Sequence, residues 1–367
     1  MALDSITVRG YKSIGSVEKL ALKPINVLIG SNGSGKSNFI SVFEFLNAIL
    51  EGHLQEHVAQ AGGANRLLHF GAKVTKSIYF RVSFNGGVNQ FEITLEPTQT
   101  DELLPTSEIT YFWSKSYPTP YSYGIARIGK EAGISSPGAK GIPRHVREHL
   151  ASCRIYHFHD TSSSSPMKKS SALNDNRYLR ADGSNLPAFL YLLRNKHEIS
   201  YNLIRRTVQT VAPFFDDFIL KPQELNPETI KLEWRHKGRD FYFDASSLSD
   251  GTLRFITLAT LFLQPKNYRP SVIVVDEPEL GLHPYAMAML ASMVKRVSAE
   301  SEVILSTQSS LLLDHFEAED VLVADLVNNS TNFTRLETDK LKNWLKDYSL
   351  GQLWEKNELG GRPGDST

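Results

Sequence analysis

Eight consecutive residues, Gly30 to Ser37, carry the most specific chemistry in this 367-residue sequence. They match the pattern G-x-x-x-x-G-K-[ST], whose glycines let the backbone curl so that successive N–H groups point inward at phosphate oxygens. A helix that follows such a loop offers its positive N-terminal end to the same anion. The pattern therefore predicts that Lys36 reaches the β- and γ-phosphates of a nucleotide and that the Ser37 hydroxyl binds Mg²⁺. We expect the residues that hold ATP to be Asn32, Gly33, Ser34, Gly35, Lys36, Ser37 and Asn38.

Two adjacent carboxylates, Asp276 and Glu277, form a second candidate site. They end an apolar segment, 271–276, which is typical of a buried parallel strand, and such a strand delivers its last residues to the sheet edge where ligands bind. We expect Asp276 to hold Mg²⁺ through its water shell and Glu277 to act as the general base on the attacking water. A solvated acidic turn is the alternative, and the phosphate-binding pattern upstream favours the catalytic interpretation.

The segment 247–252 precedes a helix predicted at 251–263 and contains a serine and a glycine that suit an anion. The N–H groups of Ser249 and Gly251 would lie at the N-terminus of that helix, where backbone donors have no partner within the helix. Considered alone, the segment is better explained by a plain helix cap from Ser249 or Asp250.

Taken in order, these motifs resemble those of the ABC ATPases, and in particular the RecF/SMC-like branch and the stand-alone ATPases related to the OLD nucleases. The resemblance covers about half of the chain and rests on residues 8–14, 29–38, 248–252, 276–284 and 306–309. It implies that Ser249 and Gly251 contact the γ-phosphate of ATP held by a second subunit, so that two copies close head to head. It also implies a catalytic contribution from Gln308, at the place of the family's switch histidine. Tyr11 or Lys12 would touch the nucleotide or, equally well, only form a hairpin turn.

Several positions depart from that family pattern. Asp250 replaces the second glycine of the signature and puts a negative charge near phosphate unless it points away. Gln308 can form hydrogen bonds but cannot take a proton, so Glu277 carries the base role alone and hydrolysis is expected to be slow. Where the family has a Q-loop glutamine, residues 157–160 read His-Phe-His-Asp. The cluster is compatible with a metal site, although two near-adjacent histidines are more often structural, and a role for Asp160 as a sensor of Mg²⁺ or water stays open.

The elements that must position these residues predict an α/β fold, an ABC-type P-loop NTPase head with a mixed β-sheet. Alternating apolar and polar residues at about 74–114 indicate an inserted antiparallel β layer, and residues 115–150 are expected to be irregular. Helices at about 184–195 and 199–215 form a helical lobe. Core strands are predicted at 4–9, 25–29, 154–158, 271–276, 302–306 and 320–325, and core helices at 36–50, 251–263, 284–298 and 309–315. The expected domains are 1–165, 166–245 and 246–367, the last ending in a helix and a Gly/Pro-rich tail.

Composition narrows the function further. Forty basic and forty acidic side chains balance, which argues against a wholly basic nucleic-acid-binding surface. Cys153 is the only cysteine, so an intrachain disulfide and a cysteine-rich metal site are excluded. The N-terminal residues lack the apolar core of a signal peptide, and no run approaches the roughly 20 apolar residues that span a bilayer. We expect a cytoplasmic protein without a membrane partner.

These observations favour an ATP-gated switch, a homodimer or higher oligomer that controls a partner effector, a nuclease supplied in trans, in a phage-defence setting. Residues 336–367 contain no Asp-x-Asp pair of the kind that marks the Toprim nuclease domain, and no heptad run predicts a long coiled coil. One alternative is a RecF-like DNA-repair or DNA-sensing ATPase that contacts nucleic acid through basic residues of 115–245. Another is a scaffold whose bound ATP is structural and scarcely hydrolysed.

Overall fold

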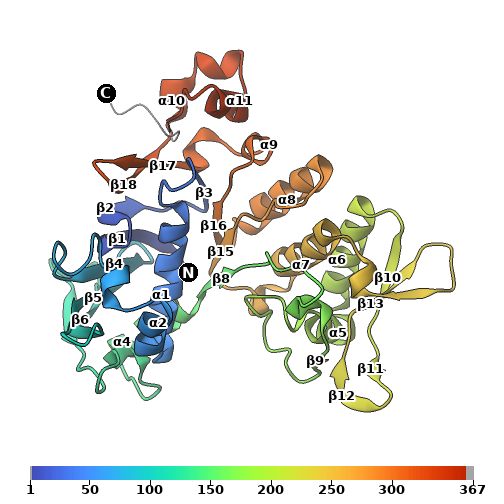
Figure 1. The fold of residues 1–367 in the computed structure, drawn as a ribbon, viewed down its shortest axis with the longest axis horizontal. Helices are drawn as coiled ribbons and strands as arrows, with labels where there is room; N and C mark the ends of the chain where they lie inside the picture. The colour runs from blue at the N-terminus through green and yellow to red at the C-terminus, as the bar shows by residue number, and fades with distance from the viewer. Residues whose placement is uncertain (1, 361–367) are drawn as a thin grey trace.

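A computed structural model describes residues 2–360, which form two six-stranded sheets, a helical lobe and two small three-stranded sheets (Figure 1). The antiparallel sheet and the first long helix lie on one side of the molecule, and the helical lobe lies on the other. The central sheet runs between them and supplies the edge at which the candidate site forms (Figure 1).

The central sheet has the strand order β18-β17-β3-β16-β15-β8, and its members are parallel except for β18. Strands β3, β15 and β16 are short, apolar and buried on both faces, as expected for a parallel sheet covered by helices. Because these strands are parallel, their carboxyl ends meet at one edge. The bounds are β3 Ile25–Ile29, β8 Cys153–Tyr156, β15 Val272–Asp276, β16 Glu302–Ser306, β17 Val321–Val327 and β18 Ser330–Arg335.

The second large sheet is antiparallel, with the order β2-β1-β4-β5-β6-β7. Buried and partly exposed residues alternate along β4 and β5, so one face of this sheet is packed and the other faces outward. This sheet is the predicted inserted layer, enlarged by the N-terminal hairpin. Its strands are β1 Leu3–Tyr11, β2 Ile14–Ala21, β4 Ile78–Phe84, β5 Asn89–Pro97, β6 Leu103–Phe112 and β7 Tyr121–Gly124.

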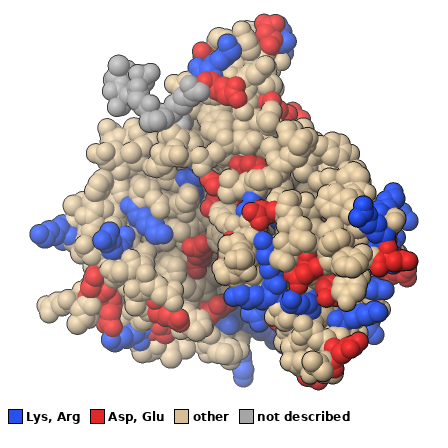
Figure 2. All heavy atoms as spheres, turned by 45° about the vertical axis from the view of Figure 1, so that its right-hand side comes forward, with Lys and Arg blue, Asp and Glu red and all other residues tan. Residues whose placement is uncertain are grey.

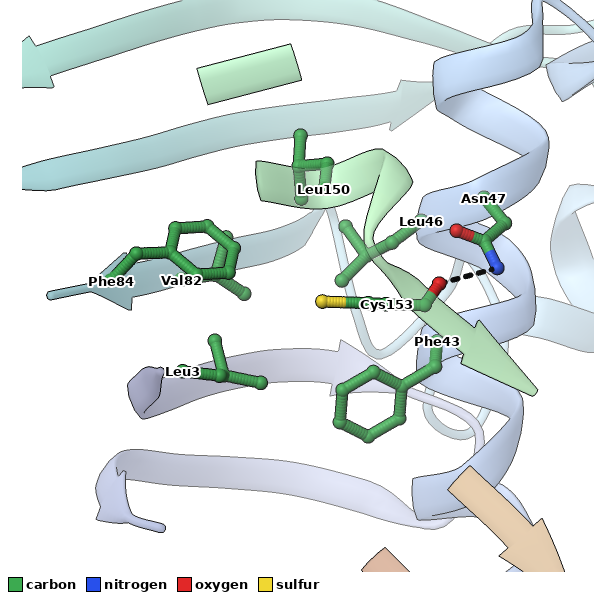
Figure 3. A pocket seen from close by; sticks show the side chains of 8 residues that line it. All are labelled: Leu3, Phe43, Leu46, Asn47, Val82, Phe84, Leu150 and Cys153. Carbon is green, nitrogen blue, oxygen red and sulfur yellow. Dashed lines mark hydrogen bonds between the residues drawn. The ribbon is translucent and has the colours of Figure 1, made fainter. Parts of the chain in front are cut away.

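Helix α1 (Lys36–Glu51) packs between the two large sheets. Figure 3 shows Phe43 and Leu46 of α1 facing the antiparallel sheet and the start of β8. The apolar residues that they meet there are Leu3, Val82, Phe84, Leu150 and Cys153. Asn47 of the same helix donates a hydrogen bond to the carbonyl of Cys153 over 3.2 Å. These contacts fix α1, and with it the loop that precedes it, relative to both sheets.

The other face of the central sheet is covered by helices whose apolar side chains form a second core with alternate residues of β3, β15 and β16. The helices are α5 Leu186–Lys196, α6 Glu198–Val211, α7 Asp250–Leu263 and α8 Pro284–Val297. The small sheets have the orders β10-β13-β14 and β11-β12-β9. Their strands are β9 Ser171–Ala172, β10 Phe215–Ile219, β11 Pro222–Gln223, β12 Asn226–Ile230, β13 Glu233–His236 and β14 Tyr242–Asp244.

The predicted fold class and core elements are confirmed, and the differences lie in short or weakly patterned segments. Helix α4 (Ile142–Ala151) lies within a region predicted to be irregular. Three further helices are short: α2 (Leu54–Gln60), α3 (Ala64–Leu67) and α9 (Ser310–Leu313). The predicted tail helix is divided into α10 (Thr338–Leu341) and α11 (Leu350–Glu355). Most of the predicted Gly/Pro-rich end lies outside the described residues.

Within residues 2–360, no helix combines the length and apolar character that crossing a membrane requires.

Candidate functional site

The glycine-rich loop 30–35 joins β3 to α1, as its pattern predicts. Gly30, Gly33 and Gly35 have φ values of 148°, 83° and 104°, a region that side chains disfavour. A Cβ added at Gly35 would collide with Oγ1 of Thr331 in β18, so this position also lacks space. At Gly33 an added Cβ would meet no atom within 4 Å, because that part of the loop faces open space.

Lys36 is almost completely buried at the start of α1. Its Nζ donates hydrogen bonds to the carbonyls of Gly30, over 2.6 Å, and Ser31, over 3.0 Å. Burial lowers the pKa of Lys36, and the neighbouring carboxylates of Glu277 and Asp276 partly offset that shift. The loop therefore encloses a cation whose charge is stabilised mainly by carbonyls and acidic neighbours.

Asp276 and Glu277 lie at the carboxyl end of β15, next to the end of β16. Oδ1 of Asp276 accepts a hydrogen bond from the hydroxyl of Ser306, a residue that is fully buried. The N–H of Glu277 donates to the carbonyl of Ser306 over 3.1 Å. Glu277 has a φ of 40°, an unusual conformation for a residue with a side chain and one that is common at functional sites.

Gln308 lies opposite Glu277, two residues beyond β16, and its Nε2 donates to Oε1 of Glu277. The backbone of this segment is held by Glu279, whose Oε1 accepts from the N–H of Gln308 over 3.0 Å and from the hydroxyl of Thr307 over 2.6 Å. Glu279 is buried, which raises its pKa. Glu279 is a supporting residue to which the sequence analysis assigned no role.

An open depression of about 350 Å³ lies over the glycine-rich loop. Its lining brings together most of the residues predicted to bind nucleotide with one of the predicted catalytic residues: Asn32, Gly33, Gly35, Lys36, Ser37, Asn38 and Gln308. Ser34 is buried within the loop instead. Ser249 and Gly251 are not part of this lining, because they lie on α7 on the other side of the central sheet (Figure 1).

The first turn of α7 is packed closely against the segment that follows β15. Ser249 caps the helix, with its Oγ accepting from the N–H of Thr252 over 3.2 Å. A Cβ added at Gly251 would collide with the carbonyl oxygen of Gly281, so a side chain is excluded there. Ser249 therefore does cap the helix, as one interpretation of the sequence predicted, and the anion site of the other interpretation would involve the same turn.

One turn further along α7, Arg254 joins three segments of the chain. Its Nε donates to the carbonyl of Phe158 over 2.9 Å and its Nη2 to that of His159 over 3.1 Å, and its Nη1 donates to the carbonyl of Leu280. The side chain is buried, which lowers the pKa of the guanidinium, and no carboxylate among the described residues forms an ion pair with it. The sequence analysis missed Arg254.

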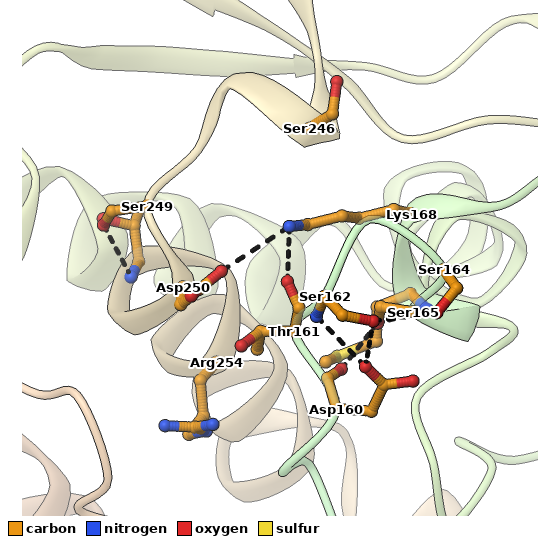
Figure 4. A network of polar contacts seen from close by, with 12 residues as sticks. Asp160, Thr161, Ser162, Ser164, Ser165, Lys168, Ser246, Ser249, Asp250 and Arg254 are labelled. Carbon is orange, nitrogen blue, oxygen red and sulfur yellow. Dashed lines mark hydrogen bonds and ion pairs between the residues drawn. The ribbon is translucent and has the colours of Figure 1, made fainter.

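Asp250, the acidic departure from the signature, faces Lys168, which closely follows the serine-rich loop 161–165 after β8 (Figure 4). The Lys168 Nζ lies 3.5 Å from Oδ1 of Asp250 and donates to the carbonyl of Thr161 over 2.5 Å. Asp160, which was considered as a sensor, instead accepts from the N–H and hydroxyl of Ser162, over 3.0 and 2.6 Å. Its contacts are thus within its own loop.

The two histidines after β8 have separate partners. Nε2 of His157 lies 2.6 Å from Oε1 of Glu44 on α1, and this hydrogen bond raises the pKa of His157. Nε2 of His159 lies 2.8 Å from the carbonyl oxygen of Asp276. His159 thus supports the end of β15 by a hydrogen bond, and His157 connects the segment after β8 to α1.

Tyr11, considered as a nucleotide contact, is fully buried. Its hydroxyl lies 3.2 Å from the carbonyl of Ser41, and its ring stacks on Phe45 with the ring centroids 5.5 Å apart. That alternative is wrong for Tyr11 because the first strand turns its ring into the core. Lys12 donates to Oγ of Ser41 over 2.9 Å.

The residues of the loop 30–37 and of the acidic pair fit a nucleoside triphosphate with Mg²⁺. The loop supplies backbone donors, a helix N-terminus and the Lys36 ammonium beside an open depression, which together suit a phosphate chain. Within residues 2–360, no cluster of three or more His, Cys, Asp or Glu side chains is arranged for a metal. Magnesium at phosphates takes only one or two protein ligands, and Ser37 and Asp276 have suitable oxygens for it.

Solved structures of SMC heads share this fold. One, an SMC head bound to the C-winged helix domain of ScpA, superposes with a TM-score of 0.58 and 18% identity, covering 93% of this chain and 99% of that one. Another, from Pyrococcus furiosus and bound to the C-terminal domain of ScpA, gives a TM-score of 0.55 and 14% identity, covering 94% and 98% of the two chains. At these identities the similarity concerns the fold alone.

Among curated proteins, Urease accessory protein 2 of Cryptococcus neoformans var. grubii is 34% identical over 110 residues. That alignment covers 28% of this chain and only 8% of the relative's length.

The AAA_21 family, described as “AAA domain, putative AbiEii toxin, Type IV TA system”, matches residues 25–314, well over half of the chain. The match begins at β3 and extends past Gln308, so it includes both the glycine-rich loop and the acidic pair. The chain belongs to the AAA_21 family, and its fold is that of the SMC heads.

Proposed function

We propose that this protein is an ATP-dependent switch in which two copies close head to head around MgATP. ATP is bound by the loop 30–37, with Mg²⁺ held by Ser37 and Asp276. Glu277 takes a proton from the attacking water, and Gln308 orients that water or the γ-phosphate. Ser249 and Gly251 of the second copy complete the site from the opposite side.

The observation that carries this proposal is the separation of the site into two halves within one chain. Gln308 lines the depression over the loop together with Lys36 and is hydrogen-bonded to Glu277. Ser249 and Gly251 are outside that lining, and Ser249 is exposed at the N-terminus of α7. A helix N-terminus with an exposed capping serine and a glycine two residues further on suits a phosphate that arrives from another molecule.

We further propose that closure controls a partner protein, a nuclease supplied in trans, in a cytoplasmic phage-defence role of the RecF-like, OLD-related kind. Two kinds of comparison support a partner. The description of the family names a “putative AbiEii toxin” of a “Type IV TA system”, and the SMC heads of similar fold were solved with ScpA domains bound. The alternative function, a scaffold with structural ATP, would differ in that the protein keeps its nucleotide bound and shows no turnover.

Direct action on nucleic acid is less well supported by the charges of the helical lobe. Several of its basic side chains are already paired with aspartates: Arg180 with Asp175, Arg205 with Asp217, Lys231 with Asp244 and Arg235 with Asp216. Figure 2 likewise shows Lys and Arg side chains lying beside Asp and Glu over this side of the molecule. Paired charges contribute less to the field that attracts a phosphate backbone.

The first test uses Glu277→Gln, whose amide fills the same space but cannot accept a proton. We expect MgATP binding to persist and turnover to fall by at least about 100-fold. Light scattering after size-exclusion chromatography should show a dimer of this variant with ATP and a monomer without it. Turnover within a few-fold of the wild type would exclude Glu277 as the base, and turnover stimulated by DNA would favour the repair alternative.

Mixing two inactive variants tests the sharing of sites. Ser249→Arg should leave ATP binding by the isolated subunit intact but block closure, whereas Lys36→Ala should abolish ATP binding. A mixed dimer has one site with both lesions and one with neither, so partial turnover should reappear. If mixing restores nothing although both variants are folded, the head-to-head arrangement is wrong.

A further inference from the structure

The first turn of α7 contains a charge that conflicts with the role proposed for it. Asp250 stands between Ser249 and Gly251, and its side chain is 64% exposed. An acidic residue stabilises a helix N-terminus, and that alone could explain its presence. A phosphate brought to the same turn would nevertheless be repelled by an uncompensated carboxylate.

Lys168 lies where it can cancel this charge. Its side chain is only 10% exposed, and its Nζ lies 3.5 Å from Oδ1 of Asp250 (Figure 4). Lysine is rarely buried without a partner, and the remaining partner here is the carbonyl of Thr161, at 2.5 Å. The ammonium therefore has one charged neighbour and one neutral one.

The backbone around Lys168 is held in place by its own contacts. Oγ of Ser165 donates to the carbonyl of Asp160 over 2.6 Å, and Ser165 is fully buried. Met167 is buried and lies 3.2 Å from Oγ1 of Thr257, two turns along α7 from Asp250. The loop that follows β8 is thus packed along α7 and presents Lys168 to its first turn.

We propose that Lys168 is a positioning residue of the shared ATP site, whose ammonium neutralises Asp250 so that the N-terminus of α7 can accept the γ-phosphate held by a second copy. This inference rests on the proposed head-to-head function. It explains how the chain keeps an aspartate where the related ATPases have glycine. It also links the loop after β8 to the signature turn through one ion pair.

The experiment measures ATP-dependent dimerisation in the Glu277→Gln background, which keeps the nucleotide bound. Lys168→Met should weaken dimerisation by about tenfold or more, while ATP affinity of the isolated subunit stays within about twofold. Lys169→Met is the matched control, because Lys169 is the next residue, is exposed and has no ion pair within the described residues. It should dimerise like the parent.

The decisive variants combine the two charges. Lys168→Met with Asp250→Asn should regain dimerisation, because no carboxylate is left to neutralise, and Asp250→Asn alone should dimerise at least as well as the parent. A purely structural role of Lys168 would give no such rescue. Parent-like dimerisation of Lys168→Met, or a double variant no better than the single one, overturns the inference. A parent that stays monomeric with ATP instead overturns the proposed function.

Discussion

The buried guanidinium of Arg254 provides a sharp test of how the signature helix is connected to the acidic pair. Substitution by methionine keeps an unbranched apolar stem in place but removes every donor. Three carbonyls on two segments then lose their partner: those of Phe158 and His159 after β8, and that of Leu280 after β15. His159 itself contacts the carbonyl of Asp276, so the lost hydrogen bond to His159 is one residue removed from the proposed metal ligand, Asp276.

The size of the effect follows from two opposing terms. A hydrogen bond from a charged donor contributes about 1.5–3 kcal/mol, and three are lost. Part of that loss is recovered, since the guanidinium is buried without a carboxylate and its desolvation, visible as a lowered pKa, is relieved by methionine. We therefore expect Arg254→Met to lower the free energy of unfolding by about 2–4 kcal/mol.

Function should suffer more than nucleotide binding. The loop that holds the phosphates is not contacted by Arg254, so ATP affinity should stay within about twofold. Turnover should fall by at least about tenfold, a change of about 1.4 kcal/mol in barrier, because Leu280 and His159 both shift against the acidic pair.

The assay combines urea unfolding, ATP binding and steady-state turnover, with Arg269→Met as a matched control. Arg269 follows the same helix, is 12% exposed, donates to the carbonyl of Gln264 over 2.8 Å and pairs with Glu300. Its loss should cost stability without a selective effect on turnover. A change below about 0.5 kcal/mol for Arg254→Met, or equal losses of turnover in both variants, would refute the reasoning.

Two further predictions concern the loop and the N-terminal strand. Gly35→Ala should weaken ATP binding by at least about tenfold, because the added Cβ collides with Thr331 at a positive φ. Gly33→Ala, where the space is open, should cost only about 1 kcal/mol of stability. Equal effects of the two variants on ATP binding in calorimetry and on thermal unfolding would contradict this. Burial raises the pKa of Glu302 to about 8, and its Oε2 accepts from the N–H of Leu3 over 2.9 Å. The folded state therefore keeps a proton that the unfolded state loses, so stability falls as pH rises from about 4.5 to 8 and is level above that. Glu302→Gln should match the wild type at pH 5 and exceed it by about 2–4 kcal/mol at pH 8.5 in urea unfolding; a gain independent of pH would contradict the assignment.

Sequence patterns predicted the elements whose signals are local. The run Ile25–Ile29 is apolar except for Asn26, and the strand has these bounds in the structure. The helix after the loop shows apolar residues at helical spacing and forms within one residue of the predicted end. Helix α4 was missed because glycines and prolines surround it and its buried face contains only a few residues, among them Val146 and Leu150.

Contacts between distant segments were not predictable in the same way. Lys168 and Asp250 are separated by 82 positions, and no periodicity connects a serine-rich loop to a helix cap. Arg254 reads as one more charged residue on an otherwise apolar helix. Only the three-dimensional path of the loop after β8 shows that Lys168 and Arg254 both connect this loop to the N-terminal part of α7.

The hairpin at the N-terminus meets the start of α1 at a residue to which the resemblance gave no role. The resemblance implied Tyr11 or Lys12 as a nucleotide contact; Tyr11 lies in the core, and Ser13, the residue after Lys12, packs against α1 and β18. Its Oγ accepts from Nδ2 of Asn38 and lies 2.7 Å from Oγ1 of Thr331. The hairpin and β18 thus meet behind Gly35, where both hydroxyls leave no room for a Cβ. The glycine in the phosphate-binding pattern is therefore required twice, once for the backbone conformation that presents N–H groups to a phosphate and once for the packing of two strands more than 300 residues apart.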